Sequence, residues 1–425
     1  MRGKSAPIIR GEQGQTLLMF VLFMIVLIVF IGLGVDMGFA YMTRARLSKA
    51  VDSACLTGMR NLSQGKPAAD KAARAAFSAN YGTSGRDVPP GPAVVVNFGT
   101  VNNNAVIDVK ATDSINTYFI RVLPLWKTLA VGSSAQATRA DVNMTLVLDT
   151  SGSMDPKRGP PPGGDDSGSG GGKYLPAAVT TFINNFDDTL DSVGMVKFSV
   201  TQSDVVYAGN PHQPTAPFKN AIITAVNAFV WNGATFSQGG LTNGLAMENS
   251  ATIPPLEKVI KVVVFCTDGL ANIVQDHFSC PASTTLNFGG QDAGTGVGFY
   301  DPSSGNQLCW LNNGGSPSCC SAVSQFKSAI NGSMQPFLRP NVSADAEFRA
   351  VQVANEMRKD GIIVYAIGVG THINADFLAQ VANDPSAPGY VATSYDGAYV
   401  VANDVSQLSS VFQAIADKIL LRLSK

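Results

Sequence analysis

Charge is scarce in this sequence. Only 14% of its 425 residues are Asp, Glu, Lys or Arg, and the formal net charge is -1. Nucleic-acid binding rewards clustered Lys and Arg, so this balance excludes a general attraction to phosphate backbones. With 45% hydrophobic residues, the composition also excludes a disordered chain and a coiled coil. It fits a protein that is globular and partly embedded in a membrane.

Histidine is rarer still, and cysteine is unevenly distributed. The three histidines, His212, His277 and His372, stand far apart in the sequence, and no Cys/His spacing typical of a zinc site occurs. Four of the six cysteines crowd one segment rich in Gly, Ser and Asn: Cys280, Cys309, Cys319 and Cys320. This even number in a segment with little core predicts disulfides, whose pairing stays open.

Disulfides persist in an oxidising compartment, so the large C-terminal part is expected outside the cytoplasm. Basic residues are almost equally frequent on the two sides of the long apolar run that is described below. The positive-inside rule therefore does not decide on which side of the membrane the C-terminal part lies. Cys266, inside an apolar strand, is predicted to be a buried free thiol, and Cys55 is left undecided.

One long apolar run, TLLMFVLFMIVLIVFIGLGV, extends from Thr16 to Val35 without a charge. Roughly 20 helical residues at about 1.5 Å each cover the ~30 Å hydrocarbon core of a bilayer. The run therefore predicts one membrane-spanning helix over 16–35. A cleaved signal peptide is the alternative, but the run is longer than a usual signal core and no clear cleavage site follows it.

The whole chain is expected to divide into three parts. Residues 1–60 form an N-terminal segment with the spanning helix, and 61–140 form a small α+β region with a hairpin turning at NNN. From 141 to 425, four apolar runs alternate with amphipathic stretches, which predicts a doubly wound, mostly parallel α/β domain. The runs are MTLVLD, VGMVKFS, KVVVFCTDG and GIIVYAIGVG. Insertions at about 155–173 and 270–344 interrupt it. The first is expected to be a mobile surface loop. The second is expected to be a long loop that sets partner specificity.

Polar side chains follow two of these apolar runs and open one helical stretch. DTSGSM places Asp149, Ser151 and Ser153 after the first run, Asp268 follows VVVFCT, and Thr235 lies in a Gly-flanked loop. Ligands bind beyond the carboxyl ends of strands in an open parallel sheet. Hard oxygen donors suit Mg²⁺ first, with Mn²⁺ or Ca²⁺ as alternatives. Each motif alone is a turn or helix cap; their joint order and strand context favour a metal site.

These three motifs resemble the metal-ion-dependent adhesion site of von Willebrand factor A domains, and DSVGMVKFS is similar to that family's second strand. The resemblance extends from Asp141 to the C-terminus apart from the insertions. It implies that Ser151, Ser153 and Thr235 contact the metal directly, with Asp149 and Asp268 acting directly or through water. Asp155 is close to the family's usual further acid, but not at its spacing.

The N-terminal segment resembles a second family, the TadE/TadG-like proteins of tight-adherence (Flp) pilus assembly. That family carries the pattern Y-x-x-R-x-x-L-x-x-A-x-D-x-A after one long helix. The matching residues here are Tyr41, Arg44, Leu47, Ala50, Asp52 and Ala54. TadG-like members join this helix to a von Willebrand A domain. Leader cleavage is doubtful, because Thr16 or Met19 stands where processed members carry Glu.

Together these observations predict a single-pass protein of a bacterial inner membrane, with its C-terminal domain periplasmic or surface-exposed. The predicted function is metal-dependent protein binding in Tad pilus assembly or surface attachment. The expected partners are a protein that offers an acidic residue to the metal and other Tad components; nucleic acid is not expected. An enzyme is not expected, because Ser151 has no histidine in its motif. The alternatives are an adhesin unrelated to pili and a scaffold of an envelope chaperone or ATPase-linked complex.

Overall fold

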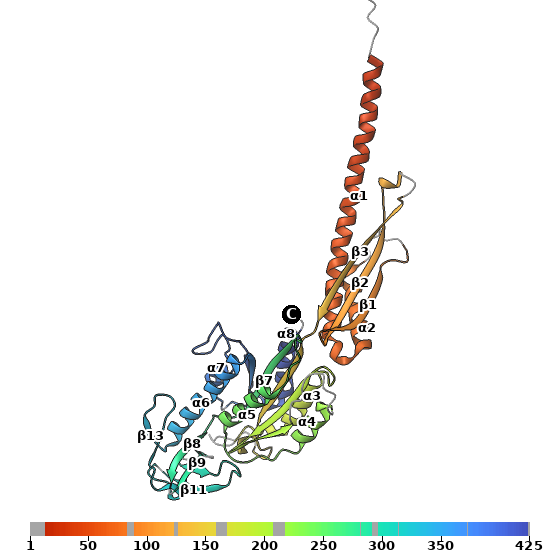
Figure 1. The fold of residues 1–425 in the computed structure, drawn as a ribbon. Coiled ribbons are helices and arrows are strands. Elements are labelled where there is room, and N and C mark those ends of the chain that lie inside the picture. The colour runs from red at the N-terminus through yellow and green to blue at the C-terminus, as the bar shows by residue number, and fades with distance from the viewer. Residues whose placement is uncertain are drawn as a thin grey trace, which may run out of the picture. The chain divides into compact units, whose positions relative to one another are not determined.

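The computed structural model describes residues 13–82, 89–122, 126–158, 168–206, 217–280, 282–290, 296–312, 314–371 and 373–423. His212 and His372 lie outside these ranges. The chain forms two compact units (Figure 1). The first contains residues 1–100 and 106–138, and the second contains residues 101–105 and 139–425.

The first unit is built on one long helix that carries the apolar run. Its elements are α1 (Gln13–Arg60), the 3₁₀ turn η1 (Leu62–Gln64), α2 (Lys66–Tyr81), β1 (Ala93–Val101), β2 (Asn104–Asn116), η2 (Ile120–Val122) and β3 (Thr128–Thr138). The part of α1 from Leu17 to Ile31 exposes its large apolar side chains, and α1 is long and apolar enough to cross a membrane. Beyond Val35 the helix continues without a break to Arg60.

A three-stranded sheet in the order β1-β2-β3 packs on this helix. The predicted hairpin is confirmed: Asn102 and Asn103 form its turn with positive φ angles of 51° and 66°. Asn tolerates this left-handed backbone conformation, which suits a two-residue hairpin turn. Ala40 of α1 packs against Ile115 and Val131 of the sheet. Small helix side chains thus let the strands approach the helix closely.

The second unit contains the doubly wound, mostly parallel sheet that the sequence predicts. Its strands run in the order β15-β14-β7-β4-β5-β6, and every pairing is parallel except that of β5 with β6. The strands are β4 (Asp141–Asp149), β5 (Ser192–Phe198), β6 (Gln202–Val206), β7 (Val259–Thr267), β14 (Ile362–Val369) and β15 (Ala398–Ala402). The edge strands β6 and β15 were not among the predicted runs, because both contain only five residues and β6 is mostly polar.

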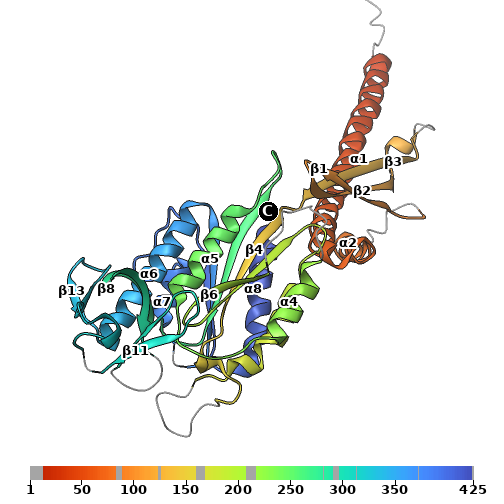
Figure 2. The same ribbon diagram turned by 60° about the horizontal axis from the view of Figure 1, so that its bottom comes forward.

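Helices cover both faces of this sheet (Figure 2). They are α3 (Leu175–Ile183), α4 (Phe218–Asn227), α5 (Ser237–Ser250), α6 (Arg339–Lys359), α7 (Ala375–Ala382) and α8 (Leu408–Leu423), with 3₁₀ turns η3 (Gly152–Met154), η4 (Gly171–Lys173) and η6 (Val405–Gln407). Alternate strand residues enter opposite cores: Val264 packs with α3 and α8, whereas Val263 packs with α5 and α6. On α8, the face formed by Val411, Phe412, Ile415 and Ile419 is buried.

The second insertion is a folded sheet rather than a long loop. It contains β8 (Ile273–Cys280), β9 (Ala282–Gly289), β10 (Val297–Tyr300), β11 (Gln307–Leu311), η5 (Ser318–Cys320), β12 (Gln325–Lys327) and β13 (Met334–Pro336). Strands β8 to β11 form one antiparallel sheet. Phe288 lies at its centre, in ring contact with Phe278 and Phe337. This aromatic cluster supplies the core that the polar composition of the segment hides.

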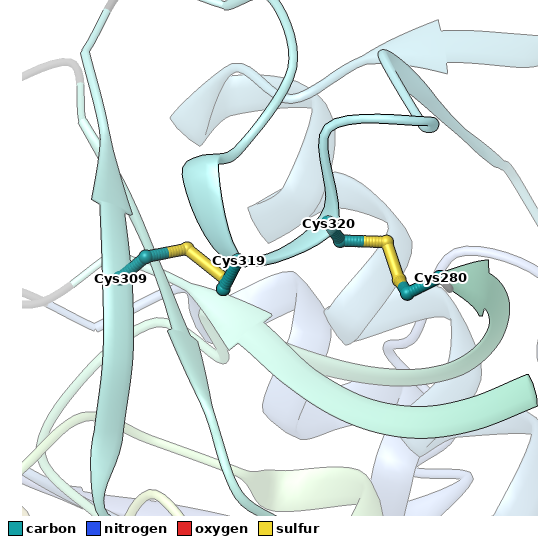
Figure 3. The surroundings of a disulfide bond; sticks show 4 residues. All are labelled: Cys280, Cys309, Cys319 and Cys320. Carbon is teal, nitrogen blue, oxygen red and sulfur yellow. A yellow bond between two sulfur atoms is a disulfide. The ribbon is translucent and has the colours of Figure 1, made fainter. Parts of the chain in front are cut away.

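Two disulfides close the end of this insertion, Cys280–Cys320 and Cys309–Cys319 (Figure 3). Their Cα atoms are 5.0 and 5.7 Å apart. The predicted buried free thiol at Cys266 is confirmed, and Cys55 is also free and buried. The structure therefore supplies the pairing that the sequence left open.

Removing the two disulfides separately should have unequal effects. Cys280–Cys320 spans 40 residues and Cys309–Cys319 spans 10. Loop-closure entropy then predicts that replacing the first pair by serine lowers the free energy of unfolding by about 4 kcal/mol, and replacing the second by about 3 kcal/mol. Denaturant unfolding of the two double-serine variants measures both values. A larger loss from the short-loop pair would contradict this ranking.

A buried acid lies under the face of β4 that α5 covers. Glu248 of α5 accepts hydrogen bonds from the Asn143 amide (3.0 Å) and the Thr145 hydroxyl (2.7 Å). Burial raises the pKa of Glu248 from 4.5 to about 8, although these bonds oppose the shift. Burial thus favours the neutral form of Glu248 in the folded state. Between pH 4.5 and about 8, the folded protein keeps the Glu248 proton, whereas the unfolded chain has released it.

Glu248 should therefore make the protein less stable as the pH rises from about 4.5 to 8. The slope approaches about 1.4 kcal/mol per pH unit inside this window. We expect Glu248→Gln to remove this slope and to be more stable than the wild type at pH 8, as measured by thermal unfolding across the pH range. The exposed Glu356 provides the matched control, Glu356→Gln. Equal pH profiles for wild type and Glu248→Gln would refute the assignment.

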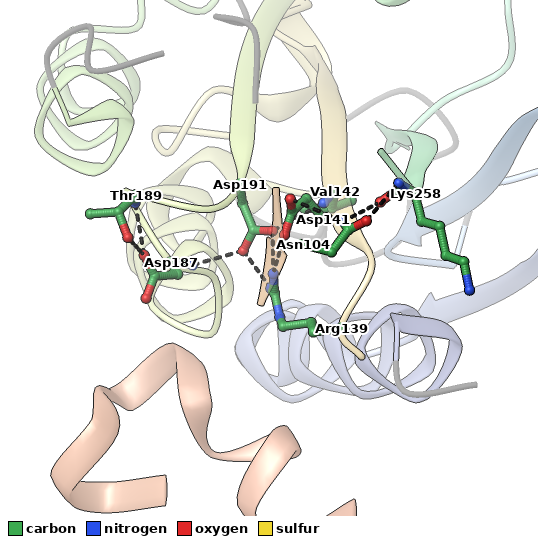
Figure 4. A network of polar contacts seen from close by, with 8 residues as sticks. All are labelled: Asn104, Arg139, Asp141, Val142, Asp187, Thr189, Asp191 and Lys258. Atoms are coloured by element: carbon green, nitrogen blue, oxygen red, sulfur yellow. Dashed lines mark hydrogen bonds and ion pairs between the residues drawn. The ribbon is translucent and has the colours of Figure 1, made fainter. Parts of the chain in front are cut away.

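A buried ionic network lies where β4 begins (Figure 4). The Arg139 guanidinium donates two hydrogen bonds to Asp191, at 2.9 and 2.6 Å, and one to Asp141 at 3.4 Å. Asp191 also accepts the backbone N–H groups of Val142 (3.0 Å) and Asp187 (2.8 Å). Burial alone would lower the pKa of Arg139, but the charge and hydrogen bonds of Asp191 outweigh it and raise that pKa. The guanidinium is therefore held charged within the second unit.

Candidate metal centre

The candidate site lies at the carboxyl ends of the two central strands. β4 and β7 are parallel neighbours in a register that pairs Leu148 with Cys266. The next residues, Asp149 and Thr267, therefore stand side by side, and the Thr267 hydroxyl donates a 2.6 Å hydrogen bond to Asp149 Oδ2. The backbone N–H of Ser151 donates to Asp149 Oδ1 at 2.8 Å. Both oxygens of this buried carboxylate are thus fixed.

A chain of hydroxyl contacts connects the two strand ends. Ser151 Oγ lies 2.9 Å from Ser153 Oγ, and Ser153 Oγ donates to Asp268 Oδ1 at 2.6 Å. The sharp turn of η3 after β4 places both serines on the side that faces the end of β7. Asp149, Ser151, Ser153 and Asp268 are therefore brought together as the sequence predicts.

The loop that carries Thr235 meets the same place. Gly233 adopts a φ of +81°, which favours glycine, and its carbonyl accepts the N–H of Gly152 at 3.0 Å. A Cβ atom added at Gly269 would lie 3.8 Å from both Ser153 Oγ and Thr235 Oγ1. Thr235 thus borders the site across a glycine. Among the described residues, it makes no hydrogen bond to either acid.

Three further residues support the site, and the sequence interpretation missed them. Ser169 Oγ donates to Asp268 Oδ2 at 2.6 Å, Thr267 fixes Asp149, and the Asn272 side chain accepts the Thr235 N–H at 2.8 Å. Thr267 directly precedes Asp268, so its place at the strand end was a usable signal. Ser169 lies in low-complexity sequence that carries no such signal.

Ser169 also corrects the expectation that all of the first insertion is a mobile loop. The segment 159–167 lies outside the described residues, but 168–173 is ordered against the site. The Gly170 N–H donates to the Ser153 carbonyl at 3.2 Å, and a Cβ at Gly168 would collide with that same carbonyl. The glycines that suggest mobility in the sequence here permit close backbone packing.

The position of Asp149 and Asp268 disfavours their ionised, carboxylate forms. Burial raises the pKa of Asp149 to about 7, and the nearby charge of Asp268 adds to the shift. Burial likewise raises the pKa of Asp268, against the hydrogen bonds of Ser153 and Ser169. A cation among these oxygens would remove the penalty.

The donor set fits a hard divalent cation. The site offers two carboxylates and several hydroxyls, and such oxygens are the ligands of Mg²⁺, Mn²⁺ and Ca²⁺. Within the described residues, no three His, Cys, Asp or Glu side chains gather into a metal cluster. Asp155 instead accepts the N–H of Lys157 at 2.9 Å and closes a local turn. The site therefore depends on hydroxyl ligands.

A serine hydrolase arrangement is not found among the described residues. The Ser151 hydroxyl contacts Ser153, whereas His277 Nδ1 lies 3.2 Å from Thr285 Oγ1 in the β8–β9 pair. Ser151 thus has no general base among its hydrogen-bond partners in the parts of the chain that are described.

Comparison with protein families matches residues 14–61 to the family described as Flp pilus-assembly TadE/G-like. This region contains the motif that suggested the TadE/TadG resemblance, which is therefore confirmed for the N-terminal segment. A search of curated proteins finds no match.

Solved structures with similarity to this chain include von Willebrand A domains and pilus proteins. The pilus adhesin SpaC from Lactobacillus rhamnosus GG is 16% identical, with a TM-score of 0.42, over 81% of this chain and 35% of its own. The vWF domain of the type V pili tip protein Mfa5 from Porphyromonas gingivalis is 16% identical, with a TM-score of 0.40, over 68% of this chain and 97% of its own.

A third similar structure is proximal thread matrix protein 1 from the mussel byssus, described with a zinc-occupied MIDAS motif. It is 16% identical, with a TM-score of 0.34, over 67% of this chain and 46% of its own. The matches to SpaC and to the mussel protein thus span less than half of those chains. The SpaC and Mfa5 structures are described as pilus proteins.

Proposed function

We propose that this protein is a membrane-anchored, cation-dependent protein-binding module that acts in Tad pilus assembly or surface attachment. The TadE/G-like match supports the pilus setting. The contact chain from Ser151 through Ser153 to Asp268 carries the binding part of the proposal. This chain of contacts connects the ends of β4 and β7. Its contacting atoms are all oxygens, which are the ligands that a hard cation prefers.

In the proposed site, Ser151, Ser153 and Thr235 hold the cation through neutral hydroxyls. Asp149 and Asp268 lie beside them and balance its charge directly or through water. A bound divalent cation would supply a Lewis-acidic position for one more oxygen ligand. Because hydroxyl ligands leave the charge of the cation undercompensated, an acidic side chain of a partner protein suits that position. Mg²⁺ is the proposed cation, with Mn²⁺ and Ca²⁺ as alternatives.

The proposed location is a bacterial inner membrane, spanned once by α1, with the second unit in the periplasm or at the surface. The exposed apolar stretch of α1 from Leu17 to Ile31 supports the anchor. The two disulfides of the insertion support an oxidising compartment. The boundaries that we propose for the domains remain 1–60, 61–140 and 141–425.

Calorimetry on the full-length chain in lipid nanodiscs tests the proposal. We expect Mg²⁺ and Mn²⁺ each to bind with about one ion per chain, as one strand-end site requires. A folded chain that binds neither ion would show that the strand-end residues serve only as turn and cap chemistry.

A further inference from the structure

The segment that follows β2 is fixed to α1 where the apolar run ends. The Asp36 carboxylate accepts the backbone N–H groups of Tyr118, Phe119 and Ile120 at 2.9, 2.9 and 2.7 Å. Asp36 is itself buried and follows Val35, the last residue of the apolar run. The carboxylate therefore holds this turn at one height on the helix. Figure 1 shows the tip of the β2–β3 pair beside the middle of α1.

Two further contacts fix the turn on both sides. Phe119 packs so closely on Gly32 that a Cβ at this glycine would collide with the phenylalanine side chain. On the returning side, the Thr117 hydroxyl donates to the carbonyl of Trp126 at 2.6 Å. Residues 123–125 lie outside the described part of the chain. Both described flanks are thus attached to each other or to α1.

The side chains of these flanks remain exposed although they are large and aromatic. Tyr118, Phe119 and Trp126 expose 50%, 46% and 57% of their surfaces, and the basic residues Arg121 and Lys127 beside them are exposed as well. Aromatic side chains next to Lys and Arg are the composition that gathers at a membrane–water interface, where ring and headgroup meet.

We propose that Tyr118, Phe119 and Trp126 form a second membrane contact, which inserts into the headgroup region of the phospholipid bilayer that α1 spans. This inference rests on the proposed membrane anchoring. Roughly 20 residues at about 1.5 Å each place the edge of the ~30 Å hydrocarbon core near Val35, beside the attachment points Gly32 and Asp36. The contact would limit how far α1 slides or tilts in the bilayer.

Fluorescence quenching of single-tryptophan chains tests the inference. The full-length chain contains three tryptophans, Trp126, Trp231 and Trp310. One variant keeps Trp126 (Trp231→Phe with Trp310→Phe), and the matched control keeps Trp310, which lies in the second unit and is 37% exposed. Both are reconstituted into phosphatidylcholine vesicles with or without brominated acyl chains. Aqueous acrylamide is the opposing quencher.

We expect bromolipid to remove most of the Trp126 emission and to leave Trp310 unchanged, with acrylamide giving the reverse order. Adding Asp36→Ala to the Trp126 chain should reduce the bromolipid effect, because the turn loses its attachment to α1. Acrylamide quenching of Trp126 without bromolipid quenching would overturn the inference. Vesicle flotation separates this outcome from failure of the anchor: a chain that floats but is not quenched refutes only the second contact. A chain that does not float refutes the anchor and the contact together.

Discussion

Replacing Ser151 by alanine in the full-length chain should abolish measurable Mg²⁺ binding while the protein remains folded. Ser151 contributes one hydroxyl to the contact chain between the two strand ends, and alanine leaves only a methyl group there. Losing a supporting residue of a metal site commonly lowers metal affinity by about 10–100-fold, and a direct ligand should cost at least as much. Calorimetry, with circular dichroism as the folding check, measures the effect.

Two further variants test whether the effect of Ser151→Ala is specific to the proposed ligands. Thr267→Val removes the hydrogen bond that fixes Asp149 but no proposed ligand, so a loss of about 10–100-fold is expected. Asp155→Asn lies in the same loop, in a local turn, and should bind Mg²⁺ as the wild type does. If Asp155→Asn is impaired and Ser151→Ala is not, the assignment of ligands in this loop is wrong.

Replacing Arg139 by methionine should destabilise the second unit by about 3–5 kcal/mol. The variant leaves Asp191 and Asp141 buried without their cation, whereas the wild type satisfies both through the guanidinium. Truncating one partner of a buried pair costs more than the pair itself contributes, because the remaining charge stays away from water. Chemical denaturation followed by circular dichroism measures the change in the free energy of unfolding.

A double variant distinguishes charge from packing. Asn at position 191 has no charge but keeps a side-chain oxygen for the Val142 N–H. We therefore expect Arg139→Met with Asp191→Asn to recover part of the stability that Arg139→Met loses. A double variant less stable than Arg139→Met would show that the unpaired charge of Asp191 costs less than the hydrogen bond that its second oxygen accepts from the Asp187 N–H.

The alternation of apolar runs with amphipathic stretches made much of the fold predictable from the sequence. The four apolar runs became β4, β5, β7 and β14, and the motif residues lie at strand ends because parallel strands bring their carboxyl ends to one edge. The N-terminal helix was equally predictable, because an uncharged apolar run of this length is typical of a helix long enough to cross a membrane.

The remaining features depended on contacts between distant residues. The insertion at 270–344 looked like a loop because its apolar residues are spaced among Gly, Ser and Asn, yet Phe278, Phe288 and Phe337 meet in space. Ser169 joins the site because backbone without side chains can pack on the Ser153 carbonyl. Disulfide pairing likewise follows from strand positions, which cysteine spacing alone does not fix.

Anomalous diffraction from crystals of the protein grown with Mn²⁺ tests the central claim most directly. We expect one strong manganese peak at the carboxyl ends of β4 and β7, within about 2.0–2.5 Å of the hydroxyl oxygens of Ser151 and Ser153. An ordered strand-end site without a peak, or a peak only elsewhere on the chain, would contradict a cation-dependent binding site at this position.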